Sequence, residues 1–305
     1  MRRGVVDIGT NSTRLFLAEV DGGRVGEVLE RRTVVTRLGA GVDADGWLAD
    51  DSIERVYAVL DEYRALIDRH GGAPVVAIMT SAVRDAANGA EFAGAVGERW
   101  GFEPHILTGD EEARLTFLGA TSERDPDDRT PTLVIDIGGG STEFVIGTGH
   151  DVTYHVSNQA GVVRQTERHL HSDPPAEAER EALARDVRAV FAAGVPEEHR
   201  RSVAHAIGVA GTATSMASIA QELEPYDPDK VEGYVVSEAQ CRAILERLAG
   251  LTLEKRRRVR GLHPDRAPTI VAGVIILLET LALFGLSSFE VSEHDILRGA
   301  ALGLD

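Results

Sequence analysis

Two stretches of the chain share one pattern of apolar and polar positions. An apolar run ends in Asp-Ile-Gly, a small polar turn follows, and a second apolar run begins, once within residues 5–20 and once within residues 134–146. Two apolar runs around a glycine-bearing turn predict a β-hairpin. Two copies of this pattern in one chain predict an internal duplication.

The pattern that follows each hairpin also repeats. After the first hairpin, apolar periodicity predicts a strand at 25–38, a helix at 53–67, a strand at 75–79, a helix from 81, a strand at 105–107 and a helix at 109–120. A polar connector at 121–130 precedes the second series: strands at 133–137, 143–146 and 152–156, helices at 162–170 and 176–191, a strand at 206–210, a helical region at 237–286 and a strand at 289–291. The first series reads βββαβαβα, and the second restarts the same order with added helices. We therefore expect an α/β fold with two domains, 1–124 and 125–305, a ligand cleft between them, and a last helix that packs back on the first domain.

Composition narrows the class of protein. The 305 residues are 43% hydrophobic and 27% charged, which is typical of a globular protein with two domains. The net charge of −17 argues against binding to nucleic acid or to an anionic membrane, because the field of the protein repels polyanions. The single Cys241 excludes an intramolecular disulfide, and the longest apolar run, 270–278, is too short to span a bilayer. The first residues do not resemble a signal peptide, so we expect a cytoplasmic protein.

The two hairpin tips are candidate phosphate sites. Glycine lets backbone N–H groups approach a ligand closely, and short hydroxyl and amide side chains add donors. The candidate donors are Gly9, Asn11, Ser12 and Thr13 at the first tip and Gly138, Gly139, Gly140 and Ser141 at the second. For either tip alone a structural turn is the favoured interpretation, but the pair favours phosphate binding.

Several carboxylates near these tips are candidates for catalysis or metal binding. Asp7 and Asp136 end the incoming strands, where a divalent cation is within reach. Thr108 and Glu111 fit a capping box, which leaves Glu112 as a general base or, alternatively, as a solvated first-turn carboxylate. Glu143, just after the second tip, is a candidate for holding a metal ion or the attacking water.

Candidate cations for an anionic substrate are Arg14, Arg84 and Arg266, each of which has the alternative of an ordinary surface arginine. A dense basic run at 255–260 is either a solvated helix end or a contact for an extended polyanion. His169 and His171 hint weakly at a metal site.

Five motifs in order along the chain resemble the exopolyphosphatase and guanosine pentaphosphate phosphohydrolase (Ppx/GppA) family. They are DIGTNSTRL at 7–15, TSAVRDA at 80–86, GDEEAR at 109–114, DIGGGSTE at 136–143 and GVAGTAT at 208–214. The resemblance implies the duplicated actin-like fold of the sugar kinase, Hsp70 and actin superfamily, related to ribonuclease H. It also implies release of terminal phosphate from inorganic polyphosphate or from pppGpp. Longer family members carry further C-terminal helical domains, so we expect the short, two-domain form.

By motif position, the resemblance implies that Glu112 is the catalytic carboxylate and that Glu143 and Asp136 organise the water and Mg²⁺ or Mn²⁺. It implies that Arg14 and Arg84 bind phosphate, and it extends this role to Arg266. A homodimer is expected by analogy with the family. The chain departs from the family pattern after Arg266, where Pro268 and Thr269 stand in place of an acid.

Two functions of other classes fit the same fold. One is an ATP-dependent kinase or chaperone ATPase, because fold alone does not determine function. The other is a non-catalytic sensor that binds polyphosphate or a guanosine tetra- or pentaphosphate. The short second domain and the motif around Glu111 and Glu112 argue against the kinase or chaperone, whereas a sensor would differ from the hydrolase by binding its ligand without turnover. The residues do not choose between polyphosphate and pppGpp.

Overall fold

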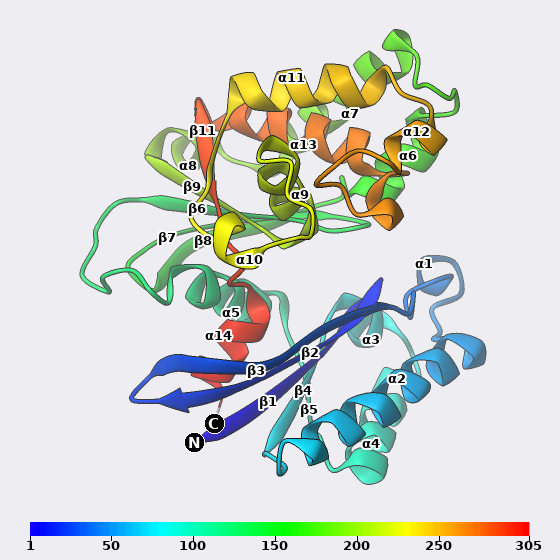
Figure 1. Cartoon of the computed structure of the whole chain (residues 1–305), viewed down its shortest axis with the longest axis vertical. Helices are drawn as coiled ribbons and strands as arrows, with labels where there is room; N and C mark the ends of the chain where they lie inside the picture. Colours follow the sequence, from blue (N-terminus) through cyan, green and yellow to red (C-terminus); the bar gives the residue numbers. More distant parts are fainter. Residues whose placement is uncertain (305) are drawn as a thin grey trace. The chain divides into compact units, whose positions relative to one another are not determined.

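The computed structural model describes residues 1–304, with Asp43 and Ala44 described by their backbone alone. The chain forms two compact units, one made of Met1–Ser122 together with the residues from His294 onward, and one made of Glu123–Glu293. The predicted order of strands and helices is confirmed in both units (Figure 1). The domain bounds 1–124 and 125–305, and the cleft between the domains, stay predictions.

The first unit is built around one mixed sheet with the strand order β3-β2-β1-β4-β5. Its elements are β1 (Arg2–Ile8), β2 (Ser12–Asp21), β3 (Arg24–Val35), α1 (Val42–Asp45), α2 (Asp50–Arg69), β4 (Val75–Met79), α3 (Ser81–Asp85), α4 (Gly89–Trp100), β5 (Glu103–Ile106), α5 (Gly109–Thr121) and α14 (Ile296–Gly303). Strands β1 and β2 form the predicted antiparallel hairpin, and β1, β4 and β5 run parallel.

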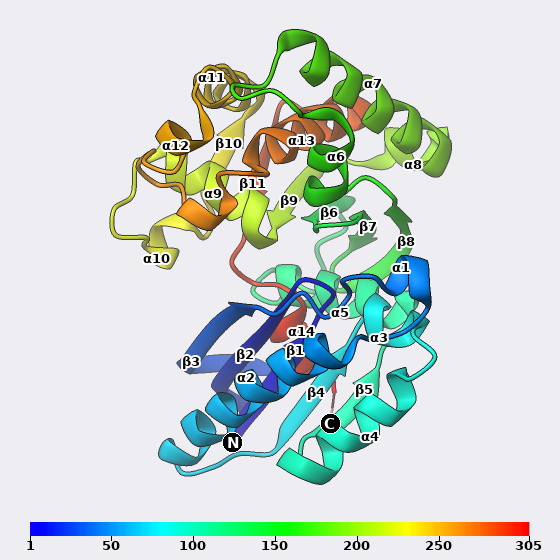
Figure 2. The ribbon, with the colours of Figure 1, turned by 90° about the vertical axis from the view of Figure 1, so that its right-hand side faces the viewer.

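Helices cover both faces of this sheet, because its strands bury apolar side chains on both sides. On one face, Val6, Ile8 and Ala77 pack with Leu60 of α2 and Val96 of α4. On the other face, a second cluster joins the sheet to α5 and α14. Figure 2 shows α2 and α4 on one side of the sheet and α14 on the other.

The second unit repeats this plan. Its elements are β6 (Thr132–Ile137), β7 (Thr142–Thr148), β8 (Asp151–Asn158), α6 (Val162–His169), α7 (Glu177–Gly194), α8 (Glu197–Ser202), β9 (His205–Val209), α9 (Ala210–Ala220), α10 (Pro228–Val231), β10 (Val235–Ser237), α11 (Glu238–Ala249), α12 (Leu253–Arg256), the 3₁₀ turn η1 (Pro264–Arg266), α13 (Ile270–Phe284) and β11 (Ser288–Val291). The strand order β8-β7-β6-β9-β11 matches β3-β2-β1-β4-β5, and β10 is added at the edge. The predicted duplicated, actin-like α/β fold is thereby confirmed.

The core of the second unit includes the long apolar stretch of the sequence. Helix α13 is buried along nearly all of its length and packs against Leu183 and Phe191 of α7, and Phe144 of β7 contacts Phe284 edge-on. The predicted buried helix at the 270–278 run is confirmed. Among residues 1–304, no helix combines the length and the apolar character that crossing a membrane requires.

Short elements are where the structure goes beyond the sequence prediction. The pattern does not predict α1, α8, α10 or β10, because elements of three to six residues carry too little periodicity to be recognised. The predicted strand at 25–38 ends early, at Val35. It ends there because Arg37 has φ +52°, a left-handed conformation that an extended strand does not contain.

Candidate active site

The first hairpin tip is a tight turn between β1 and β2. The N–H of Gly9 donates to the carbonyl of Ser12 at 2.9 Å and closes the turn. The hydroxyl of Thr10 lies 3.0 Å from that of Ser81, and the buried hydroxyl of Thr13 lies 3.0 Å from that of Thr36. Of the candidate donors at this tip, Gly9 and Thr13 are therefore engaged within the protein, and the exposed side chain is that of Asn11.

Arg14 lies between two buried carboxylates. Its Nε and Nη2 contact Asp7 Oδ2 at 2.8 and 2.7 Å, and its Nη1 donates to Asp295 Oδ2 at 2.5 Å. Burial raises the pKa of Asp7 despite the adjacent guanidinium. Burial acts the same way on Asp295, but Arg14 and Arg31 hold the pKa of this carboxyl below its ordinary value. The sequence does not predict this arrangement, because it offers Arg14 as a ligand for phosphate or as a surface arginine.

Glu112 and Arg84 meet at the start of α5. The capping box predicted for Thr108 and Glu111 is confirmed: Thr108 Oγ1 accepts from the N–H of Glu111, and Glu111 Oε2 accepts from the N–H of Thr108 at 2.8 Å. These hydrogen bonds hold the pKa of Glu111 below its ordinary value. Arg84 donates to the carbonyl of Leu107 at 2.8 Å, and the same nitrogen lies 3.5 Å from Glu112 Oε2. Glu112 thus lies beside a guanidinium, next to the capping box that Thr108 and Glu111 form.

The second hairpin tip rests on the start of α6. The N–H of Gly138 donates to the carbonyl of Ser141 at 3.0 Å, as at the first tip. The carbonyls of Gly138, Gly139 and Gly140 accept N–H groups from residues 161–164, and Arg164 Nε also donates to the carbonyl of Gly140 at 2.9 Å. A side chain at Gly161 would overlap the backbone of Gly139 and Gly140, so this contact requires glycine. Arg164 is a cation at this tip that the sequence analysis does not single out.

The acidic residue after the second tip is held by two hydroxyls. Ser141 Oγ donates to Glu143 Oε1 at 2.5 Å, and Ser157 Oγ donates to the same oxygen at 2.8 Å. Asp136 and Glu143 are register partners on β6 and β7, so their side chains share one face of the sheet.

The two hairpins differ at one equivalent position. On β1 and β2 the register partner of Asp7 is Arg14, whereas on β6 and β7 the partner of Asp136 is Glu143. Arg14 offsets the charge of Asp7, whereas Asp136 and Glu143 place two carboxylates on one face of the sheet. The two hairpins therefore differ in charge at this equivalent position.

Arg266 ends the 3₁₀ turn η1 and packs against the start of α9. A Cβ at Gly211 would overlap Cζ, Nη1 and Nη2 of Arg266, so the guanidinium lies directly on the glycine. A side chain at Gly211 would therefore displace the guanidinium from its present place.

The basic run at 255–260 serves mainly to hold the fold. Arg256 is 3% exposed and donates to the carbonyls of Leu248, Leu251 and Ala267. Arg258 pairs with Glu254 at 2.7 Å, and Arg260 pairs with Glu224. A polyanion contact through the whole run is therefore disfavoured.

The histidine and cysteine candidates also have structural roles. His169 Nε2 lies 3.3 Å from Asp186 Oδ2, and residues 1–304 hold no group of three or more His, Cys, Asp or Glu side chains arranged for a metal ion. Cys241 is buried in α11, and burial raises the pKa of its thiol to about 12. Cys241 is thus a small buried residue of this helix.

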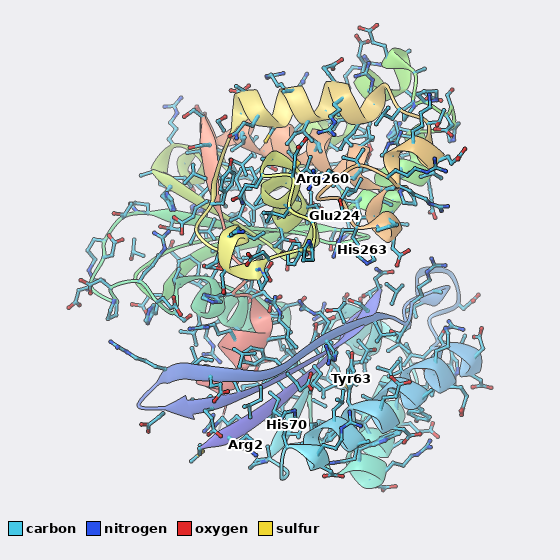
Figure 3. The ribbon with its side chains drawn as sticks, in the orientation of Figure 1. Arg2, Tyr63, His70, Glu224, Arg260 and His263 are labelled. Carbon is cyan, nitrogen blue, oxygen red and sulfur yellow. The ribbon has the colours of Figure 1, made fainter. Side chains whose placement is uncertain are left out.

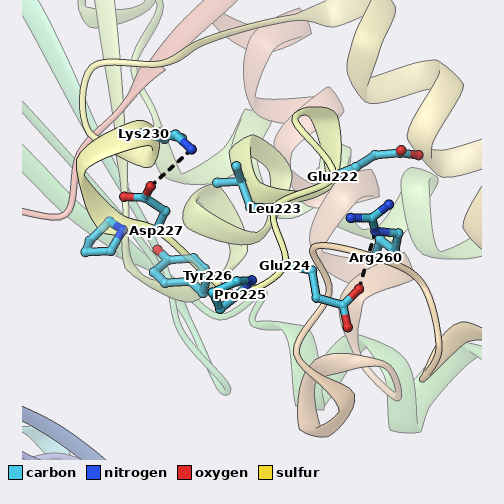
Figure 4. Close-up of a pocket in the computed structure, with 9 residues that line it drawn as sticks. Glu222, Leu223, Glu224, Pro225, Tyr226, Asp227, Lys230 and Arg260 are labelled. Atoms are coloured by element: carbon cyan, nitrogen blue, oxygen red, sulfur yellow. Dashed lines mark ion pairs between the residues drawn. The ribbon is translucent and has the colours of Figure 1, made fainter.

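A pocket of 380 Å³ lies in the second unit, and none of the candidate catalytic, metal-binding or phosphate-binding residues lines it. It is lined by residues 222–228 together with Lys230 and Arg260 (Figure 4). Its charges pair with each other, Glu224 with Arg260 at 3.3 Å and Asp227 with Lys230 at 3.3 Å. Figure 3 shows Glu224 and Arg260 in the second unit, and in the first unit Tyr63, whose hydroxyl donates to the Thr13 carbonyl behind the first tip. Because these charged side chains pair within the protein, we interpret the pocket as part of the surface loop at 222–228 and not as a ligand site.

The chain is similar to known proteins over essentially its whole length. A family model described as the Ppx/GppA phosphatase family matches residues 16–302. Exopolyphosphatase 2 of Mycobacterium tuberculosis is 38% identical over 318 residues, which cover 99% of this chain and 98% of that protein. The solved Ppx/GppA family member from Aquifex aeolicus matches with a TM-score of 0.86 and 32% identity, covering 99% of this chain and 96% of that one. An exopolyphosphatase from Cytophaga hutchinsonii matches with a TM-score of 0.85 and 26% identity, covering 98% and 96%.

Proposed function

Because the chain belongs to the Ppx/GppA phosphatase family, we propose that it is a hydrolase that releases terminal phosphate from inorganic polyphosphate. The observation that carries this proposal is the position of Glu112. It stands in the first turn of α5 beside Arg84, while Thr108 and Glu111 form the capping box of this helix. The name and full-length similarity of exopolyphosphatase 2 support polyphosphate as the substrate class.

In the proposed reaction Glu112 acts as the general base. It accepts a proton from a water molecule as the water oxygen bonds to the terminal phosphorus. The bond between this phosphorus and the bridging oxygen breaks, and inorganic phosphate and a chain shorter by one phosphate are the products. Arg84, next to Glu112, is placed to contact the phosphate oxygens on which charge develops.

The proposed cofactor is Mg²⁺ or Mn²⁺. Asp136 and Glu143 fit such an ion, because Mg²⁺ is commonly bound by one or two carboxylates together with the phosphates of a substrate. Asp7 fits less well, since Arg14 occupies its Oδ2, although its buried Oδ1 has no hydrogen-bond partner among the described residues. When bound, the ion supplies positive charge that stabilises the transferred phosphoryl group.

The remaining candidate residues have proposed binding roles. Asn11 and Ser12 at the first tip and the backbone of Gly139 and Gly140 at the second offer donors to phosphate oxygens, and Arg266 offers a guanidinium, whereas the hydroxyl of Ser141 is engaged with Glu143. We also propose a cytoplasmic homodimer that binds neither nucleic acid nor membranes, in keeping with the net charge of −17.

Phosphate release by the purified protein tests this function. With Mg²⁺ present, long polyphosphate, short polyphosphate and pppGpp are compared, using the wild type, Glu112→Gln and Glu111→Gln. We expect Glu112→Gln to lower kcat by about two orders of magnitude or more, because the general base is lost. Glu111→Gln is the matched control, since glutamine also fits a capping box, and it should retain activity.

The outcome separates the alternatives. Hydrolysis of pppGpp in preference to polyphosphate would assign the alarmone as substrate. If the protein binds polyphosphate or pppGpp without turnover, the enzyme proposal is wrong and a sensor takes its place. Equal losses in the two variants would show that Glu112 has no special role.

A further inference from the structure

The segment that follows β3 is attached to the first hairpin tip. The N–H groups of Thr36 and Arg37 both donate to the carbonyl of Asn11, at 3.1 and 3.0 Å, and the N–H of Gly39 donates to the carbonyl of Thr10 at 2.9 Å. On either side of Arg37, Thr36 is 2% exposed and Leu38 is fully buried. Three backbone hydrogen bonds and these buried flanks therefore fix the position of Arg37 beside the tip.

Arg37 adopts a backbone conformation that arginine rarely takes. Its φ is +52°, in the left-handed region where a Cβ is crowded by the following carbonyl and where glycine is normally found. In residues 1–304 the other non-glycine residues with positive φ are Ala210 and Glu222. A conformation that costs free energy persists because the surrounding contacts hold it, and such sites concentrate where ligands bind.

The side chain at this strained position is an exposed cation. Every guanidinium nitrogen of Arg14 contacts a carboxylate, and the guanidinium of Arg84 contacts Leu107 and Glu112. By contrast, the described part of the chain places no carboxylate within ion-pair distance of Arg37. A guanidinium presents a planar fork of N–H donors that matches phosphate oxygens. The exposed Asn11, on the tip itself, lies against the backbone of Arg37.

We propose that Arg37 is a phosphate-binding residue of the first tip, whose guanidinium contacts an oxygen of the substrate's phosphate chain. The proposal rests on the proposed function, since it takes the tip as a phosphate site. It adds a cation that the sequence pattern conceals, because residues 25–38 look like one continuous strand. It also gives a reason for arginine to stand where glycine would fit without strain.

Direct binding tests this role without turnover. In the Glu112→Gln background, titration calorimetry with short polyphosphate compares Arg37 with Arg37→Gln. Glutamine keeps a side chain in the same backbone conformation but removes the charge. We expect Kd to rise about tenfold, the effect of losing one charge-assisted contact. An unchanged Kd overturns the proposal, whether or not the wild-type protein proves to be a hydrolase.

A second pair of variants separates binding from folding. Arg37→Gly relieves the strained φ, so it should raise Tm while it raises KM for polyphosphate about tenfold and leaves kcat within about twofold. Glu222→Gly is the matched control, because Glu222 has φ +50° and is exposed in the second unit. It should raise Tm without changing KM. A parallel rise in KM in both variants would contradict a specific contact at Arg37.

The same assays keep the two proposals apart. If the wild type hydrolyses neither substrate but Arg37→Gln weakens polyphosphate binding, the hydrolase proposal fails and the Arg37 site stands. If hydrolysis is found and both Kd and KM are insensitive to Arg37, the hydrolase stands and the Arg37 site fails. Parallel titrations with pppGpp show whether Arg37 recognises any phosphate chain or polyphosphate alone.

Discussion

At the scale of single residues, the most consequential finding is that Arg14 is shared by two buried carboxylates. Asp7 is its neighbour across the hairpin, whereas Asp295 comes from a segment 281 residues further along the chain. Asp295 also accepts from the N–H of Leu297 at 2.9 Å and so caps α14. One carboxylate thus holds the arginine and begins the last helix.

Replacing Asp295 with Asn should destabilise the protein in a pH-dependent way. Asn caps helices as well as Asp, so Asp295→Asn keeps the cap and removes the charge opposite Arg14. At pH 7 we expect the free energy of unfolding to fall by about 2–4 kcal/mol. Urea unfolding of both proteins across pH 3–7 gives this difference directly.

The sign of the pH dependence follows from the lowered pKa of Asp295. A depressed pKa in the folded state contributes stability above the ordinary value of 3.8, and this contribution is lost as pH falls below it. The gap between the wild type and Asp295→Asn should therefore be widest near neutrality and narrow below about pH 4. The same gap at every pH would mean that the charge of Asp295 contributes nothing.

At the scale of elements, α5 and α14 cross unusually closely because both present glycine at the contact. A Cβ at Gly119 would overlap the carbonyl of Asp295, and a Cβ at Gly299 would overlap the carbonyl of Leu115. The crossing fixes the start of α14, and with it the carboxylate that holds Arg14. Helix α5 also carries Glu112 in its first turn.

Gly299→Ala should break this crossing. Since the added methyl group meets backbone and not a movable side chain, we expect a loss of about 2–3 kcal/mol in the free energy of unfolding. Gly94→Ala is the matched control, because Gly94 also lies within a helix but has open space around its missing Cβ. It should gain about 0.5–1 kcal/mol. Thermal unfolding compares the two, and a Gly299→Ala protein as stable as the wild type would refute the close crossing.

At the scale of the whole molecule, charge is the dominant feature. Far from the protein surface, an anionic substrate is repelled by the net charge of −17, and the positions of individual side chains have little effect. Local cations such as Arg84, Arg266 and Arg37 act only at short range. Long-range repulsion and short-range attraction therefore respond differently to salt.

This contrast predicts the salt dependence of catalysis. At constant free Mg²⁺, kcat/KM for long polyphosphate should rise by a few-fold between about 10 and 100 mM salt, because screening weakens the repulsion of the approaching polyanion. The measurement is initial rate at low substrate in a salt series. A steady fall would show that the local arginines, and not the net charge, control association.

The sequence by itself determined the plan of this protein. Local periodicity and turn-forming residues predict the two Asp-Ile-Gly hairpins, the repeated order of strands and helices, and the capping box before Glu112. These signals depend only on residues that are close together in the sequence. The family resemblance rests on the same local motifs, and the family assignment confirms it.

The tertiary structure decided which of these residues act together. Three contacts depend on segments that are distant in the sequence, and local periodicity does not encode them. Asp295 binds Arg14, buried Arg256 donates to three backbone carbonyls, and Gly211 packs against Arg266. Arg37 is the clearest case. Its neighbours suggest a strand, but hydrogen bonds to the first tip hold it in a left-handed turn, because satisfying these backbone groups outweighs the strand preference of its sequence.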